Sequence, residues 1–130
     1  MLTFKEIKTR SVILTLKRPI KAKIAYITKW PLLLVDLYTN EGIVGRSYLQ
    51  PYLEKSLQYI SSIIDDFNEV LRNKELAPFD NFDLMRQSLH FIGYEGLSLT
   101  AVSAVDMAIW DAVSKAADKP LCCYLGGTVG

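Results

Sequence analysis

Hydrophobic positions along the chain follow two different periods, and the change between them falls near Pro51. Before it, Thr3 to Leu16, Leu32 to Thr39 and Ile43 to Leu49 are rich in Val, Ile, Leu and Thr with partial alternation, as in half-buried strands. The short link between the last two segments ends in Gly42, which can adopt the positive φ of a tight hairpin loop. This part of the chain therefore predicts a three-stranded antiparallel meander.

Beyond this point, apolar residues recur three and four positions apart, as they do on one face of an amphipathic helix. One such stripe runs from Leu53 to Leu71. A second helix is predicted over "APFDNFDLMRQSLHFIG", with Asp80 or Asn81 as its N-terminal cap and Gly93 as its end. Its predicted inward-facing residues are Phe82, Met85, Leu89 and Ile92.

A third helix is predicted within "LSLTAVSAVDMAIWDAVSKAA", where apolar or small residues occupy nearly every side. Such a helix should be buried around most of its circumference. Ser98 is its predicted cap, Asp118 to Pro120 end it, and "PLCCYLGG" adds a short helical turn. The fold class is therefore α+β: a three-stranded antiparallel meander followed by a small helical bundle, in one domain over residues 1–130.

The stretch "RPIKAKIAYITKWP", Arg18 to Pro31, is unusual for a connection between strands. It contains no Gly, Asn or Asp to form a turn, yet five of its side chains are large and apolar: Ile20, Ile24, Tyr26, Ile27 and Trp30. Long loops in compact domains are mostly functional or disordered, and exposed apolar patches mark binding surfaces. Two explanations stay open. The stretch forms a binding surface, or its side chains return to the core or continue the strands as an irregular hairpin.

Composition narrows the classes of partner. Fifteen basic and fourteen acidic residues leave a net charge of +1, so no broad positive field attracts nucleic acid or anionic lipid. No apolar run approaches the roughly 20 residues of a membrane helix, and no signal-peptide pattern opens the chain. Cys122 and Cys123 are adjacent and do not readily form a disulfide with each other. We expect a cytoplasmic protein that binds neither nucleic acid nor membrane.

Residues able to perform chemistry are scarce. The chain has one histidine, His90, and no glycine-rich phosphate loop, so neither a metal site nor a hydrolytic centre is predicted. Cys122 and Cys123 are interpreted as small packing residues. Asp106 lies inside the apolar third helix, where a carboxylate needs a Lys, an Arg or a backbone donor as its partner. We interpret Asp106 and Asp111 as structural carboxylates rather than catalytic ones.

One long segment, "AVSAVDMAIWDAVSKAADKPLCCYLGG" (Ala101 to Gly127), resembles the end of the N-terminal domain in the mandelate racemase and muconate-lactonizing group of the enolase superfamily. "PLLLVDLYTNEGIVGRSYL" is similar to the hairpin of that domain, and the resemblance extends over essentially the whole chain. The motif residues that recur in this order are Ala101, Ser103, Ala104, Asp106, Ala108, Trp110, Asp111, Lys119, Pro120, Leu121, Leu125, Gly126 and Gly127.

The resemblance implies an enolase N-terminal domain-like cap over the mouth of a (β/α) barrel. In this family a proton is removed α to a carboxylate, and Mg²⁺ holds the enediolate before racemisation, dehydration or cycloisomerisation. Acids, bases and metal ligands lie on barrel strands. A barrel needs about 250 further residues, so we expect no catalytic or metal-binding residue in this chain. The resemblance assigns substrate contacts to Ile20 and Ile27 in the first connection and to Tyr52 after the hairpin.

Two functional hypotheses remain. The first is a capping and substrate-specificity domain of a Mg²⁺-dependent enzyme acting on a small carboxylic acid, inactive by itself. The second is a stand-alone interaction or self-associating module. Because a cap without its barrel should expose a large apolar face, we also expect a homo-oligomer.

Overall fold

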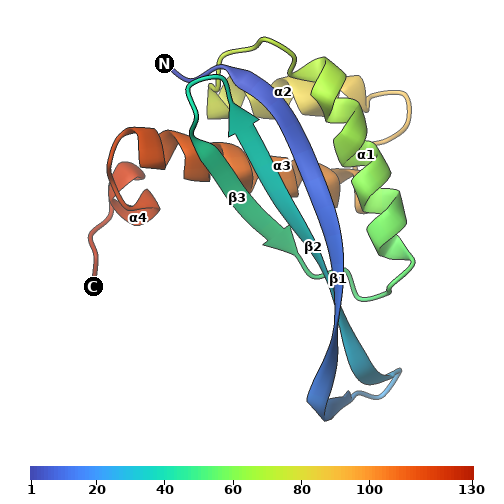
Figure 1. The fold of residues 1–130 in the computed structure, drawn as a ribbon. Coiled ribbons are helices and arrows are strands. Elements are labelled where there is room, and N and C mark those ends of the chain that lie inside the picture. Colours follow the sequence, from blue (N-terminus) through green and yellow to red (C-terminus); the bar gives the residue numbers. More distant parts are fainter.

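The three strands form a single sheet, and helices cover one of its faces (Figure 1). This is the arrangement in a computed structural model, which describes residues 1–130. The elements in chain order are β1 (Phe4–Lys21), β2 (Tyr26–Thr39), β3 (Val44–Leu49), α1 (Ser56–Val70), α2 (Pro78–Ser88), α3 (Leu97–Ala116) and α4 (Leu121–Tyr124).

The sheet is an antiparallel meander in the order β1-β2-β3, followed by the helices, so the predicted α+β class is confirmed. Gly42 has a φ of 88° in the β2–β3 turn, as predicted. The side chain of Thr39 also closes this turn: its Oγ1 donates to the carbonyl oxygen of Ile43 at 2.8 Å and accepts from the Ile43 N–H at 3.0 Å.

The segment expected to be a connection is instead strand. β1 and β2 continue past β3 as a two-stranded ribbon, which we call the hairpin arm (residues 13–31). The irregular-hairpin explanation is therefore the correct one for its backbone: a register shift falls between Thr15 and Ile20, after which Ile20 pairs with Ile27. Figure 1 shows the arm projecting away from the helices.

The turn at the tip of the arm needs no glycine. Ala22 donates its N–H to the carbonyl oxygen of Ala25 at 2.9 Å, and Ala25 donates back at 3.4 Å. The two residues between them, Lys23 and Ile24, do not have positive φ. Such a turn accepts most residue types, so the missing Gly, Asn or Asp did not exclude a hairpin here.

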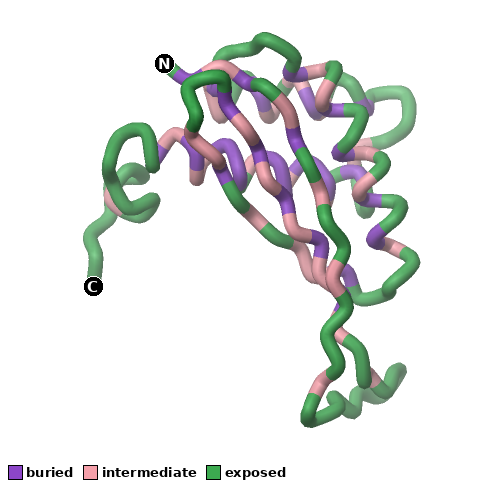
Figure 2. Tube along the Cα trace, in the orientation of Figure 1, coloured by how far each residue is buried: buried purple, intermediate pink, exposed green.

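The core lies between the sheet and the helices (Figure 2). Alternation in β2 puts Leu33, Val35 and Leu37 on the helix-facing side, where all three are fully buried. The helical stripe predicted from Leu53 to Leu71 corresponds to α1, which buries Leu57, Ile60, Ile64 and Phe67 against the sheet.

α3 lies unusually close to β3 because both elements carry small residues at their contact. A Cβ atom on Gly45 would overlap the carbonyl oxygen of Ala108 and lie 2.9 Å from the Cβ of Ala112. The Ser47 hydroxyl donates to the Ala104 carbonyl oxygen at 2.6 Å. By length and composition α3 is the one helix that could cross a membrane, which corrects the expectation that no apolar run approaches that length. More than half of its most apolar stretch is buried in the core, and this position accounts for its apolar character.

Asp111 ties α3 to the sheet. Its Oδ2 accepts the backbone N–H of Arg46 at 2.7 Å and the Nζ of Lys115 at 2.5 Å. The Lys115 Nζ also donates to the carbonyl oxygen of Val44 at 3.0 Å. The carboxylate is half-buried and its Oδ2 accepts from two donors, so the predicted structural role of Asp111 agrees with its contacts.

The helix caps differ from those predicted. α2 begins at Pro78 after Ala77, and neither Asp80 nor Asn81 caps it; a proline in the first turn costs no hydrogen bond. Asn81 is instead buried and donates its Nδ2 to the carbonyl oxygen of Glu75 at 3.1 Å. α3 begins at Leu97 after Gly96, whose φ is 62°, and Ser98 is buried rather than capping.

The end of α2 also corrects one predicted core residue. The helix ends at Ser88, one turn before the expected stop at Gly93. Ile92 therefore lies beyond the helical stripe and is 77% exposed instead of facing inward. Met85 and Leu89 are buried as predicted, and Phe82 packs against the core while partly exposed.

An asparagine on α1 replaces the missing neighbour of the edge strand β1. The Ile7 N–H donates to the Asn68 Oδ1 at 2.7 Å, and the Asn68 Nδ2 donates to the Ile7 carbonyl oxygen at 3.3 Å. These two bonds satisfy backbone groups that a further strand would otherwise pair. They hold α1, and with it the end of the loop after β3, beside the sheet.

Candidate functional site

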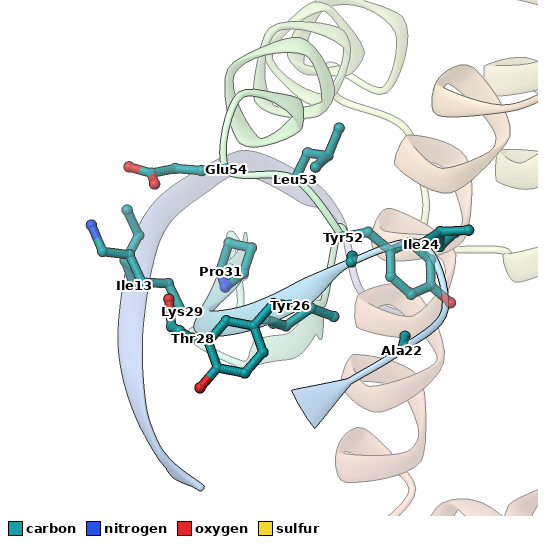
Figure 3. Close-up of a pocket in the computed structure, with 12 residues that line it drawn as sticks. Ile13, Ala22, Ile24, Tyr26, Thr28, Lys29, Pro31, Tyr52, Leu53 and Glu54 are labelled. Carbon is teal, nitrogen blue, oxygen red and sulfur yellow. The ribbon is translucent and has the colours of Figure 1, made fainter. Parts of the chain in front are cut away.

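The largest hollow in the molecule lies between the hairpin arm and the loop that follows β3 (Figure 3). Its volume of about 650 Å³ is in the range of small-molecule sites. Most of its lining is apolar, and the arm supplies the larger share of it. The lining residues are Ile13, Ala22, Ile24, Ala25, Tyr26, Ile27, Thr28, Lys29, Pro31, Tyr52, Leu53 and Glu54.

Two of the three predicted substrate contacts meet in this hollow. Ile27 reaches it from β2 and Tyr52 from the loop after β3, although the two residues belong to separate segments of the chain. Ile20 does not line the hollow. It pairs directly with Ile27 across the arm and therefore lies on the same face, next to the lining rather than within it.

Several lining residues were not singled out from the sequence as substrate contacts. Ile24 lies at the arm tip and Leu53 and Glu54 follow Tyr52, while Ile13 and Pro31 face each other across the base of the arm. The available signal was the apolar content of Arg18 to Pro31, which did include Ile24. The convergence of the arm with the loop after β3 depends on long-range packing, so no local pattern revealed it.

Most apolar side chains of the site are accessible to solvent and do not serve this domain's own core, although Pro31 at the base of the arm is buried. Ile24 is 94% exposed and Tyr52 is 80% exposed, and Figure 2 shows the outer part of the arm as an exposed ribbon. Holding such groups in water is unfavourable by roughly 25 cal/mol for each Å² of apolar surface. The arrangement therefore favours a ligand, or another protein surface, that removes these groups from water.

The lining of the hollow contains few ionisable side chains. Lys29 and Glu54 are the only charged residues among its lining side chains. No group of three or more His, Cys, Asp or Glu side chains able to hold a metal exists anywhere in residues 1–130. Since Mg²⁺ prefers several oxygen ligands, one glutamate does not fit that ion. The hollow supplies apolar contact and one ammonium group suited to a carboxylate.

The other candidate residues lie away from the hollow. His90 follows α2 on the surface and packs edge-on against Phe91, with ring centroids 5.4 Å apart. Cys122 is exposed and Cys123 half-buried, with their sulfur atoms 4.0 Å apart as free thiols. The interpretation of the cysteines as packing residues is therefore wrong for Cys122 in this chain, because Cys122 is exposed to solvent on α4.

Asp106 has neither a cationic partner nor a backbone donor in the structure, contrary to the expectation that a Lys, an Arg or a backbone donor would meet it. Partial burial raises the pKa of its carboxyl above the ordinary value, and the side chain of Trp110 offsets part of that rise. Trp110 stands one turn further along α3 and contacts the rings of Phe79 and Tyr124 at centroid distances of 5.6 and 6.2 Å.

This pKa shift predicts a pH-dependent stability effect. Because the folded pKa lies above the unfolded one, the ionised carboxylate destabilises the fold, and the loss develops as pH rises through about 4. Asp106→Asn should therefore stabilise the isolated chain at pH 7, and the gain should shrink as pH falls. Urea unfolding between pH 4 and pH 7 measures it, with Ser103→Ala as a non-titrating control on the same helix face. An equal gain at every pH would contradict the assignment.

Comparison with known protein families gives a match over nearly the whole chain. The family described as "Mandelate racemase / muconate lactonizing enzyme, N-terminal domain" matches residues 4–126. Among curated proteins, D-galactonate dehydratase of Klebsiella pneumoniae is 25% identical over 111 residues, which are 82% of this chain and 28% of that protein. The chain thus spans less than a third of this relative's length.

Comparison with solved structures also identifies relatives that match nearly the whole chain. An enolase from an alpha proteobacterium (BAL199) with bound magnesium is 49% identical, with a TM-score of 0.94 over 98% of this chain and 35% of its own. A Bradyrhizobium enolase complexed with magnesium and mandelic acid is 34% identical, with a TM-score of 0.92 over 99% of this chain and 36% of its own. In both, about two thirds of the relative lies outside the matched part.

Proposed function

This chain belongs to the mandelate racemase and muconate lactonizing enzyme family, as its N-terminal domain, and we propose that it caps the active site of a magnesium-dependent enzyme and selects the substrate. The observation that carries the proposal is the apolar hollow in which Ile27 from the arm and Tyr52 from the loop after β3 converge. The proposed substrate is a small carboxylic acid.

Three observations support the capping role. The arm projects beyond the body of the domain, so its tip can reach a second domain (Figure 1). Most of its large side chains are exposed and are not used by the core. The loop carrying Tyr52, Leu53 and Glu54 borders the same hollow, so the arm and this loop would act on one ligand.

A cap of this kind works by excluding water. When a substrate is bound, the apolar side chains at the hollow leave solvent and cover it, and they return to solvent when product departs. Drying the site strengthens the electrostatic interactions that stabilise a developing negative charge. Ile27 and its cross-strand neighbour Ile20 would contact the part of the substrate far from the carboxylate, while Lys29 would favour an anion.

The magnesium ion would be held by the catalytic part of the enzyme, because the chain itself offers no suitable ligand set. When bound there, the ion would stabilise the enediolate formed after removal of the α-proton. The reaction would be a racemisation or the dehydration of a hydroxy or sugar acid. A cytoplasmic location and a homo-oligomer also remain predictions.

Exchange of the α-proton in D₂O tests whether this chain needs a catalytic domain for the chemistry. A hybrid enzyme, in which this chain replaces the matched N-terminal part of the Bradyrhizobium relative, is expected to exchange the α-proton of mandelate in the presence of Mg²⁺. The isolated 130-residue chain should not exchange it, since it lacks both a metal site and a positioned base. NMR measures the exchange, and metal-dependent exchange by the isolated chain would contradict the proposal.

The stand-alone interaction module remains the second candidate. The observation that favours it is the number of large apolar side chains exposed outside the hollow, including Phe79, Phe91 and Leu125. Proton exchange by the hybrid enzyme distinguishes the two candidates, because both allow the isolated chain to self-associate. A hybrid that contains a stand-alone module would show no proton exchange, whereas a hybrid that contains a cap would.

A further inference from the structure

Charged residues are unevenly distributed between the hairpin arm and the rest of the domain. The arm contains five basic residues and no acidic one, although the chain as a whole carries a net charge of only +1. These basic residues are Lys17, Arg18, Lys21, Lys23 and Lys29. The rest of the chain carries ten basic and all fourteen acidic residues, so the body of the domain is negative. The near-neutral total therefore combines a positive arm with a negative body.

The five cations of the arm are exposed to solvent and make no ion pair. The three ion pairs of the structure all lie outside the arm, and the only carboxylate at the hollow is that of Glu54. The arm is a two-stranded ribbon that projects from the body (Figure 1), so its cations lie together and away from the acidic body. The positive charge of the arm is therefore not neutralised within this chain.

These cations are placed around the hollow, although only one of them lines it. Lys29 belongs to the lining (Figure 3). Lys21 pairs across the arm with Tyr26, which is a lining residue, and Lys23 lies between two lining residues at the arm tip. A molecule that approaches the hollow from the side of the arm therefore passes close to several ammonium groups before it makes contact.

Lysines on exposed strands also have a structural use, because charge on a strand edge prevents pairing with another chain. That use requires charge but no particular sign, whereas every charged residue of the arm is positive. A long polyanion such as nucleic acid fits poorly, since it would extend from the arm to the acidic body, where Asp65, Asp66 and Glu69 are exposed on α1. The volume of the hollow, about 650 Å³, fits a small anion instead.

We propose that the arm attracts small anionic substrates to the hollow by long-range electrostatics, and that Lys17, Lys21 and Lys23 contribute without touching the ligand. The proposal rests on the proposed function, since it concerns the substrate of an enzyme. Clustered charges of one sign raise the local concentration of an oppositely charged solute about tenfold or more. At physiological ionic strength this attraction extends over about 8 Å, and added salt screens it. Dependence on salt therefore separates it from direct contact.

Paired nitroxide probes measure the attraction on the isolated chain, without turnover. The two probes differ only in carrying a carboxylate or an ammonium group. At the backbone amides of Ile27 and Tyr52, the carboxylate probe should relax the protons about threefold more than the ammonium probe in about 20 mM salt. The order should reverse at Asp65 and Asp66 on α1, and both differences should nearly vanish in about 0.5 M NaCl. Equal relaxation by the two probes at Ile27 would overturn the proposal.

A triple substitution removes the distant cations and leaves the lining of the hollow intact. In the hybrid enzyme, Lys17→Gln with Lys21→Gln and Lys23→Gln should raise KM for mandelate about threefold or more in about 20 mM salt. The value of kcat should not change, because these residues act on the approach of the substrate and not on the chemical step. In about 0.5 M NaCl the variant and the parent hybrid should have the same KM.

The matched control removes the same amount of charge from exposed positions on the body, by Lys5→Gln, Arg72→Gln and Lys74→Gln. It should leave KM unchanged. An equal rise in KM in both variants, or a rise that persists at high salt, would overturn the proposal. Proton exchange separates the two levels: an active hybrid whose KM does not respond to the arm substitutions keeps the capping function and loses only this attraction. A hybrid without exchange contradicts the capping function, while the nitroxide probes still decide whether the arm attracts carboxylates.

Discussion

Replacing Gly45 with valine is expected to destabilise the domain by about 3 kcal/mol or more, at the upper end of what overpacking costs. The new Cβ would overlap the carbonyl oxygen of Ala108, a backbone atom that moves only if the whole of α3 shifts. Such a shift would also break the bonds from Asp111 and Ser47 that join α3 to β3. Urea unfolding monitored by circular dichroism measures the loss.

The matched control is Gly42→Ala. Gly42 has a positive φ, but no other part of the chain lies within 4 Å of the point that a Cβ would occupy, so this change costs only backbone strain, about 1 kcal/mol. Gly45→Ala should fall between the control and the valine variant. If Gly45→Val were no worse than Gly42→Ala, α3 would not be held as close to β3 as described.

Ile27→Ala in the hybrid enzyme is expected to change the preference between two acids that differ in their distal group by about 1–3 kcal/mol. This corresponds to roughly 5- to 150-fold in the ratio of kcat/KM values. The reason is local: Ile27 lines the hollow and contributes no buried contact to the core. Proton exchange on a small acid that does not reach Ile27 should persist.

The control for this prediction is Leu14→Ala. Leu14 is also an exposed apolar residue of the arm, paired with Trp30, but it does not line the hollow. Leu14→Ala should leave the preference between the two acids unchanged. Equal loss of activity with all substrates after Ile27→Ala, or an equal shift after Leu14→Ala, would mean that the arm acts through its stability and not through contact with substrate.

Much of the fold could be predicted because its signals are local. Alternation in β2, the turn glycine at Gly42 and the helical stripe of α1 each depend on neighbours within a few residues. The motif ending in Leu125 and the following two glycines was specific enough to indicate the family, which comparison with known proteins confirmed. Asp111 was also interpreted correctly, since a carboxylate within an apolar helix requires partners.

The errors arose where distant packing decides the outcome. The arm was expected to be a connection, with an irregular hairpin as the open alternative, because no Gly, Asn or Asp marks its turn; Lys23 and Ile24 turn the chain without positive φ. Ile92 was placed in the core by a periodicity that continues beyond the point where α2 ends. The hollow itself combines residues of the arm with Tyr52, Leu53 and Glu54, and no pattern within either segment indicates that they meet.

The central claim is that the substrate preference of the enzyme resides in this domain, while the catalytic domain supplies the metal and the chemistry. Domain exchange tests it most directly: kcat/KM for mandelate and for galactonate is measured in the Bradyrhizobium relative and in the hybrid that carries this chain. The account predicts that the ratio of the two values changes by about tenfold or more, with the requirement for Mg²⁺ unchanged. An unchanged ratio in an active hybrid would contradict it.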